Sequence, residues 1–209
     1  PEKGPLVPCS PVQRTFGSRI SDIHPIYLPD DSVVFSSTRD PKYIPCQRHL
    51  MANLFRLEAD GSGLRQIGFN TQFEGRASLM PDGRILYTRW EYVDKHFSSA
   101  YGLWTMNPDG TNQAVYWGNN TAVPGAAFNA HVIPNTERVV CIFGPHHDRL
   151  WGALAIVDRR RGIDGREPDG GAYAHLRVGG KNRKGLHFCA NATPGLSSVR
   201  SSTRGWSTL

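Results

Sequence analysis

The feature that most constrains the fold is a repeat of about fifty residues that occurs three times along the chain. A turn of the Pro-Asp or Pro-Asn kind recurs in steps of 52 and 53 residues, at Pro29, Pro81 and Pro134. A second corner recurs in two steps of 49 residues, at Asp60, Asp109 and Asp158. Each corner stands beside a short run rich in β-forming residues, and Pro, Asp and Gly each favour turns for a separate physical reason. This pattern indicates a β-propeller or a related repeat array.

Within each repeat, the sequence predicts four short antiparallel strands. The middle repeat is the clearest, because residues 84–90 alternate with period two directly after the turn at Pro81 to Gly83. The predicted strands are 24–28, 32–38, 53–59, 64–68, 76–80, 84–90, 102–107, 113–117, 128–133, 138–143 and 152–157. The predicted fold is all-β, a partial β-propeller of about three four-stranded blades at residues 21–70, 71–120 and 121–168. Three blades form only an arc, since propellers close with about four to eight.

The two ends of the chain are predicted to lie outside the blades. Residues 1–20 are Pro-rich and are expected to be a lead-in segment, and the absence of a signal-peptide pattern indicates the interior of a longer protein. Residues 169–209 are rich in Gly, Ser, Arg and Asn and are expected to form an irregular tail without paired strands, either a disordered linker or an aberrant reading frame. The sequence has no run of about eighteen apolar residues, so no membrane span is expected.

The net charge of +6 is concentrated in that tail. Residues 159–209 contain ten Lys or Arg and three Asp or Glu, whereas residues 1–158 contain fourteen and fifteen. The repeats are therefore close to neutral. A basic tail can bind phosphate through counterion release, but this tail has few of the aromatic residues on which single-strand binders stack bases, namely Tyr173, Phe188 and Trp206. Specific nucleic-acid binding is therefore not predicted.

Three long connections carry most of the side chains that could do chemistry. They join the second and third strands of successive repeats, at residues 40–51, 91–101 and 144–151. Because they follow equivalent strands, we expect them to project from one face, where binding residues concentrate on rigid scaffolds. The predicted ligand-recognition rim consists of Glu91, Asp94, His96, His146, His147 and Asp148. These carboxylates and imidazoles are suited to ligand or acid–base roles, and ordinary solvated loop charges are the alternative.

A partial metal site is predicted at Cys46 and His49, whose spacing places a thiolate and an imidazole as in half of a zinc site. A chance Cys-x-x-His pair is the alternative. The four cysteines, Cys9, Cys46, Cys141 and Cys189, form neither CxxC nor the CxxCH that attaches c-type haem. No nucleophile elbow or catalytic triad is present, so no catalytic residue is predicted.

Several phrases resemble known propeller families. The run from Ser21 to Leu28 resembles the start of the innermost strand in TolB-like propeller repeats, which would place His24 near a channel mouth, with a strand-end cap as the alternative. The phrases Tyr87 to Tyr92 and Leu103 to Thr111 resemble the middle domain of hydrazine synthase alpha-subunit-related proteins. The likeness covers about residues 20–168.

The resemblance implies a six-bladed propeller in a larger secreted or periplasmic protein, near cytochrome-type domains, with zinc or haem as possible cofactors. Because CxxCH is absent, hydrazine-forming chemistry is not carried over. The expected function is a binding and assembly scaffold that presents its loop face to a protein partner or small ligand and joins the remaining blades. The alternative is a metal- or haem-dependent redox enzyme with ligands Cys46, His49, His146 and His147.

Overall fold

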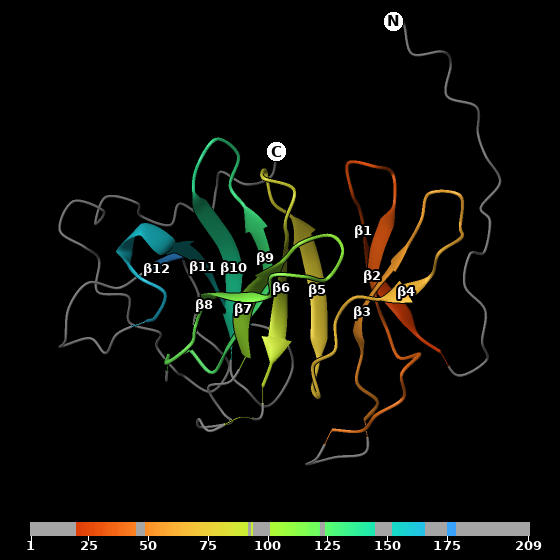
Figure 1. Cartoon of the computed structure of the whole chain (residues 1–209). Helices are drawn as coiled ribbons and strands as arrows, with labels where there is room; N and C mark the ends of the chain where they lie inside the picture. The colour runs from red at the N-terminus through yellow and green to blue at the C-terminus, as the bar shows by residue number, and fades with distance from the viewer. Residues whose placement is uncertain are drawn as a thin grey trace, which may run out of the picture.

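The computed structural model describes residues 20–44, 49–91, 93, 101–121, 124–144, 152–165 and 175–178. Throughout this part of the chain the regular structure is β-strand, apart from the single 3-10 turn η2 (Arg159–Arg161). The strands form two sheets that do not close into a ring (Figure 1). The prediction of an all-β fold is therefore confirmed. No helix in the described ranges is long and apolar enough to cross a membrane.

The first sheet is a simple antiparallel meander in chain order. It contains β1 (Asp22–Tyr27), β2 (Val33–Ser37), β3 (Asn53–Leu57) and β4 (Arg65–Gln66). Strands β2 and β3 bury most of their side chains, as the β-formers of the sequence predict, whereas β1 is mainly exposed.

The second sheet consists of two further four-stranded meanders. The first contains β5 (Glu74–Leu79), β6 (Ile85–Trp90), β7 (Tyr101–Met106) and β8 (Ala114–Trp117). The second contains β9 (Ala126–Val132), β10 (Arg138–Gly144), β11 (Ala153–Asp158) and β12 (His175–Val178). One parallel pair, Tyr101 with Ala126, joins the two meanders. We refer to the three meanders as units 1, 2 and 3.

All eleven strands predicted from the sequence are present in the structure, although β4 is shorter than expected. Strand β12 was not predicted. It pairs with β11 from Leu154 with Val178 to Val157 with His175, so the prediction that residues 169–209 contain no paired strand is wrong at these four positions. The reason is that β12 completes a sheet edge through non-local pairing, which leaves little local signal. The rest of the tail and the lead-in residues 1–19 lie outside the described residues.

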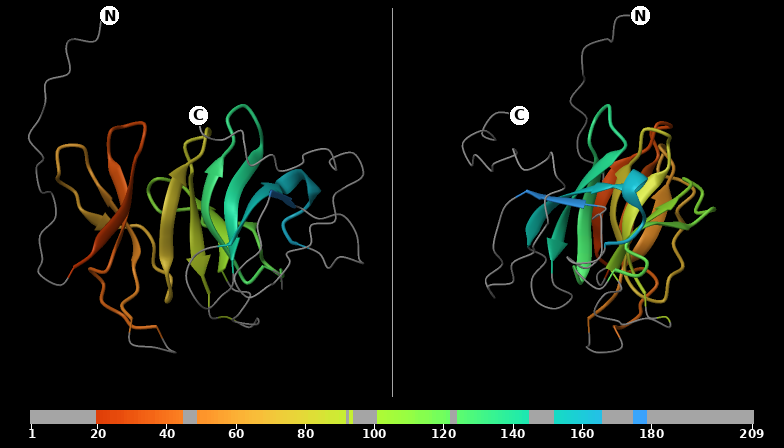
Figure 2. Two further views of the ribbon diagram at one scale, coloured as in Figure 1. Left: turned by 180° about the vertical axis from the view of Figure 1, so that it is seen from behind. Right: turned by 90° about the vertical axis from the view of Figure 1, so that its left-hand side faces the viewer.

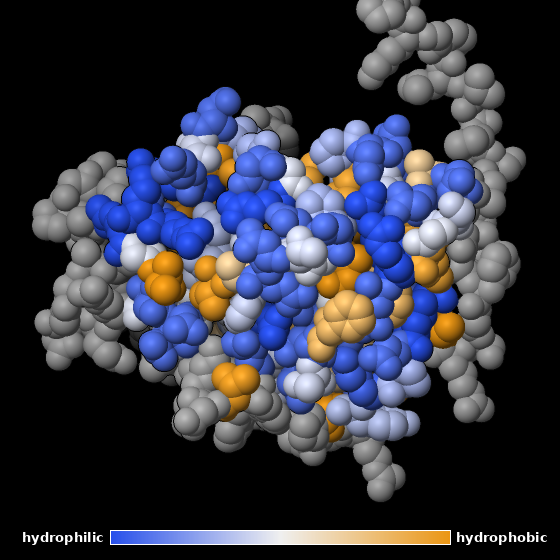
Figure 3. Space-filling view, viewed as in Figure 1, coloured by the Kyte–Doolittle hydropathy of each residue, from blue (hydrophilic) through white to orange (hydrophobic). Residues whose placement is uncertain are grey.

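The units stack against one another through their apolar faces. The core between units 1 and 2 contains Leu28, Val34, Leu54, Ile67, Ala77, Ile85, Tyr87 and Met106. The core between units 2 and 3 contains Leu86, Leu103, Tyr116, Trp117, Ala127, Ala130, Val139, Cys141, Phe143, Ala155 and Val157. The face of the molecule shown in Figure 3 is mainly hydrophilic, with small separate apolar patches. Burial between the units is therefore the main hydrophobic contribution to the arrangement.

The two ends of the strands differ in character. Figures 1 and 2 show the tight turns that follow β1, β5 and β9 together at one end of the strands. The long connections that follow β2, β6 and β10 must therefore leave from the opposite end, because neighbouring strands are antiparallel.

Candidate functional site

Most of the residues predicted for the rim cannot be placed. Asp94, His96, His146, His147 and Asp148 lie outside the described residues, as does Cys46 of the predicted metal pair.

The other two predicted residues are described. His49 is exposed, and its carbonyl accepts a hydrogen bond from the backbone N–H of Ile44 at 3.0 Å. Glu91 is buried at the end of β6. No group of three or more His, Cys, Asp or Glu side chains that could hold a metal occurs among the residues that the structure describes. The rim and the metal pair therefore stay predictions, and only Glu91 leads to a defined site.

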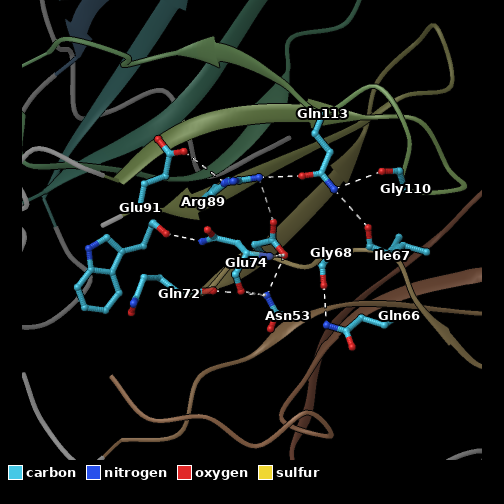
Figure 4. A network of polar contacts seen from close by, with 12 residues as sticks. Asn53, Gln66, Ile67, Gly68, Gln72, Glu74, Arg89, Glu91, Gly110 and Gln113 are labelled. Carbon is cyan, nitrogen blue, oxygen red and sulfur yellow. Dashed lines mark hydrogen bonds and ion pairs between the residues drawn. The ribbon is translucent and has the colours of Figure 1, made fainter. Parts of the chain in front are cut away.

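Glu91 belongs to a buried polar network centred on the guanidinium group of Arg89 (Figure 4). Arg89 Nε lies 3.5 Å from Glu91 Oε1, and Arg89 Nη1 lies 3.5 Å from Glu74 Oε1. Nη1 also donates to Gln113 Oε1 at 2.7 Å. The guanidinium carbon stands 4.3 Å from the ring centre of Trp104, a cation–π contact. Arg89 thus bridges two buried carboxylates and stacks on an aromatic ring.

Glu74 links the two sheets. Its side chain is fully buried, and Oε2 accepts from Asn53 Nδ2 at 2.8 Å and from the backbone N–H of Asn70 at 3.3 Å. Asn53 lies in β3 of the first sheet, whereas Glu74 lies in β5 of the second. A charge-assisted bond of this kind between separate sheets fixes their relative position.

Burial dominates the electrostatics of the network. Burial raises the pKa of Glu74, although the hydrogen bond from Asn53 and the charge of Arg89 both act to lower it. Burial also raises the pKa of Tyr87, and the nearby charge of Glu74 acts in the same direction. Glu74 Oε1 and the Tyr87 hydroxyl have no hydrogen-bond partner within the described structure. The network therefore holds a carboxyl group that takes up a proton more readily than one in water.

The network also fixes the start of the connection that follows β6. Asn70 Nδ2 donates to the carbonyl of Trp90, and Lys42 Nζ donates to the carbonyl of Asn70 at 2.6 Å. Close approach of this segment needs a glycine, because a Cβ atom at Gly68 would lie 2.2 Å from Glu74 Oε2. Lys42 and Asn70, which lie in connections that follow strands of the first sheet, thereby hold the base of a loop that belongs to the second sheet.

What this arrangement can do follows from its burial. Neither Glu74 nor Glu91 is open enough to contact a ligand directly, at 0% and 7% exposure. The chemistry available is positioning and proton storage, and the network supports the loop that carries Asp94 and His96. Sequence reasoning missed Glu74, Asn53 and Arg89. The available signal was a glutamate in a strand between Phe73 and Gly75, since an acidic residue in a buried strand needs partners.

The sequence matches no family model and no curated protein. Among solved structures, hydrazine synthase of Kuenenia stuttgartiensis matches with a TM-score of 0.56 and 18% sequence identity. The match covers 72% of this chain and 22% of that chain, so this chain spans about a fifth of the length of that protein. At this identity the similarity extends to the fold alone, and the chain is a distant structural neighbour of hydrazine synthase.

Proposed function

We propose that units 1, 2 and 3 are three blades of a larger β-propeller, and that the chain is a binding and assembly scaffold within a larger protein of the hydrazine synthase alpha-subunit kind. The observation that carries this proposal is the equivalence of the unit faces. In every unit, two cross-strand pairs between the second and third strands occupy the same register. They are Val33–Leu57 with Phe35–Phe55, Ile85–Met106 with Tyr87–Trp104, and Val139–Val157 with Cys141–Ala155.

The environment of these pairs differs between the units in an informative way. In units 2 and 3 they line the core shared with the preceding unit. In unit 1 the equivalent residues Val33, Phe35, Phe55 and Leu57 form a separate, largely buried cluster on the face turned away from unit 2. Apolar residues at a docking position that has no preceding unit favour a further blade there, because stacking of neighbours completes the core in repeat proteins.

The opposite end of the arc also carries apolar cross-strand pairs on its outer face. Val140 pairs with Ile156, and Ile142 pairs with Leu154, on the face of unit 3 that is turned away from unit 2. Leu154 is 43% exposed. The unit 3 end of the arc therefore offers exposed apolar surface, whereas Phe35, Phe55 and Leu57 at the unit 1 end are buried.

The scaffold role rests on the rigid base beneath the loops. The network around Glu74 and Arg89 ties the start of the connection after β6 to both sheets, and rigid support for loops is what binding sites on propellers require. We propose that the rim residues predicted on the three connections contact a protein partner or small ligand. A periplasmic or secreted location belongs to the same proposal.

The proposal is tested by the association of the purified chain. Two arcs can cover each other's outer faces, so we expect concentration-dependent self-association in sedimentation velocity. The variant Leu154→Asp places a charge on one outer face and should reduce association strongly. Phe69→Asp is the matched control, because Phe69 is 71% exposed and outside the strands. A chain that stays monomeric, or that associates equally well in both variants, would contradict the proposal.

The same preparation distinguishes a scaffold from a redox enzyme. Elemental analysis and an absorption spectrum, taken before and after incubation with zinc and haem, measure whether the chain retains either group. A stoichiometric metal or a Soret band that persists after dialysis would favour the enzyme.

A further inference from the structure

The first strands of the three units share a bulge that presents one polar side chain each. The register shifts between Ile23 and Ile26 in β1, between Gly75 and Ser78 in β5, and at the equivalent place in β9. At each bulge one residue other than glycine has a positive φ: His24 at 55°, Arg76 at 55° and Asn129 at 50°. We call these three residues the bulge row. Their spacings of 52 and 53 residues are those of the turn repeat.

The side chains of the bulge row lie together across the three units. Strand β5 contacts both β1 and β9. Arg76 Nη1 donates to Asn129 Oδ1 at 2.8 Å. His24 is exposed, and desolvation together with the nearby charge of Arg76 lowers the pKa of its imidazole.

Arg76 occupies a backbone position that suits it poorly. Asparagine tolerates the left-handed region because its short side chain bonds locally, and glycine has no Cβ to clash. Arginine has neither advantage. Strained residues of this kind concentrate at sites where the side chain has a task.

Among the described residues, no carboxylate compensates the charge of Arg76. The five other half-buried arginines of the described structure each have a carboxylate within 3.5 Å: Arg39, Arg56, Arg84, Arg89 and Arg138. Arg76 has none among the described residues. Its contacts are Asn129 and the ring of Phe128 at 5.7 Å, and its buried Nε has no hydrogen-bond partner there. Partial burial of an unpaired cation is costly, and an anion removes that cost.

The hydrogen-bonding capacity of the row also favours an anion. A guanidinium group only donates, so Asn129 must turn its oxygen toward Arg76 and leave its Nδ2 to donate elsewhere. The imidazole of His24 carries at least one further N–H in either protonation state. The row thus combines a positive charge with several donors from three units.

We propose that the bulge row binds an oxyanion, a carboxylate or phosphate group of a ligand, with Arg76 as its charged contact and Asn129 as a second donor. This inference goes beyond the scaffold role and does not require that the propeller be closed. It assigns the first strands of the three units, rather than the loops, to recognition of a small acidic ligand.

The test is an NMR titration of the full chain with sodium phosphate and, separately, with sodium succinate, at constant ionic strength maintained with sodium chloride. The Arg76 Nε–H and Asn129 Nδ2–H2 signals should shift and saturate with at least one of the two anions, and the comparison shows which oxyanion is preferred. Arg76→Gln should weaken binding about tenfold or more, because a hydrogen bond to a charged group is lost. Arg84→Gln is the matched control, since Arg84 is half-buried but already paired with Asp82.

A second variant keeps the test decisive if Arg76→Gln does not fold. Asn129→Asp supplies the missing carboxylate, and aspartate tolerates a positive φ. It should raise the melting temperature and abolish the shifts with both anions. Binding that is unchanged in Asn129→Asp or Arg76→Gln, or shifts that chloride alone reproduces, would overturn the proposal.

Discussion

Replacing Glu74 by glutamine separates two opposing effects on this buried carboxyl group. Burial favours its protonated form, whereas Asn53 and Arg89 favour its ionised form. Glutamine resembles the protonated acid in size and charge, and its oxygen can still accept from Asn53 Nδ2 and the Asn70 N–H. The variant therefore removes the titration and retains most of the hydrogen bonds.

The sign of the pH dependence follows from the direction in which folding moves the pKa. Because the pKa of Glu74 is raised above 4.5 in the folded state, the folded protein binds more protons than the unfolded chain just above that pH. The stability linked to this proton is fully present below pH 4.5 and is lost as pH rises through the folded pKa. A tenfold difference in proton affinity between the two states corresponds to about 1.4 kcal/mol. The cost of Glu74→Gln should therefore be about 1 kcal/mol at pH 4 and should decrease toward pH 7.

Glu74→Ala gives the upper limit for the loss of unfolding free energy at this position. It leaves a cavity, leaves the Asn70 N–H without an acceptor, and removes one of the two carboxylates of Arg89. Loss of one partner from a buried ion pair costs about 3–5 kcal/mol. Alanine should therefore be much more destabilising than glutamine at every pH.

Urea unfolding at pH 4 to 8, followed by tryptophan fluorescence, measures these free energies. Glu137→Gln serves as the control for loss of a carboxylate, because the Glu137 side chain is 76% exposed. If the cost of Glu74→Gln increases with pH, the pKa of Glu74 is lowered in the folded state. The attraction of Arg89 would then outweigh burial, and the dominance of burial in the network would be refuted.

Three further experiments test local features. Gly68→Ala should cost about 2–3 kcal/mol of stability by overpacking, since its Cβ would also lie 3.2 Å from a backbone nitrogen. Gly83→Ala has open space and a φ of 85°, and it should cost about 1 kcal/mol. Thermal unfolding compares the two variants, and equal costs would contradict the close contact at Gly68. Hydrogen bonds from arginines hold the pKa of Asp158 at about 2. The stability that Asp158 contributes is therefore present above about pH 3.8 and lost as pH falls through 2. Asp158→Asn should cost about 1–2 kcal/mol at pH 7 and less in acid unfolding experiments near pH 2. Cys141 is buried, and burial raises the pKa of its thiol. In a variant with the other cysteines replaced by serine, Cys141 should react with a disulfide reagent only after unfolding. Rapid reaction in native buffer would show that the core opens.

The fold was largely predictable because its signals are local. Turns at Pro29, Pro81 and Pro134 and the period-two alternation beside them involve only neighbours in sequence, and they located eleven strands. Strand β12 was not predictable in this way, because its four residues gain their strand geometry from the free edge of β11. Pairing of that kind depends on what the rest of the chain leaves open.

The candidate site was only partly predictable for the same reason. Glu91 stood out by its place at the start of a long connection. Its network instead depends on Asn53 and Glu74, which are 21 residues apart and meet because two sheets pack together. The bulge at His24 was also invisible in the sequence, although its position in the first strand of the repeat was anticipated.

The repeat gives evidence about function, because it places three different residues in nearly the same backbone conformation. Where the units dock, the equivalent positions Val34 and Leu86 are both apolar, as packing demands. At the bulge row the backbone is again the same, yet the residues are histidine, arginine and asparagine. Stability alone would place glycine or asparagine at all three positions.

A sequence that departs from that choice while the backbone conformation stays the same has lost stability in exchange for a property of the side chain, as functional sites commonly do. Arg76 is the largest departure, and it is also the half-buried arginine that has no carboxylate among the described residues. Two independent costs, one of backbone and one of charge, thus meet in the same residue, and a bound anion would account for both.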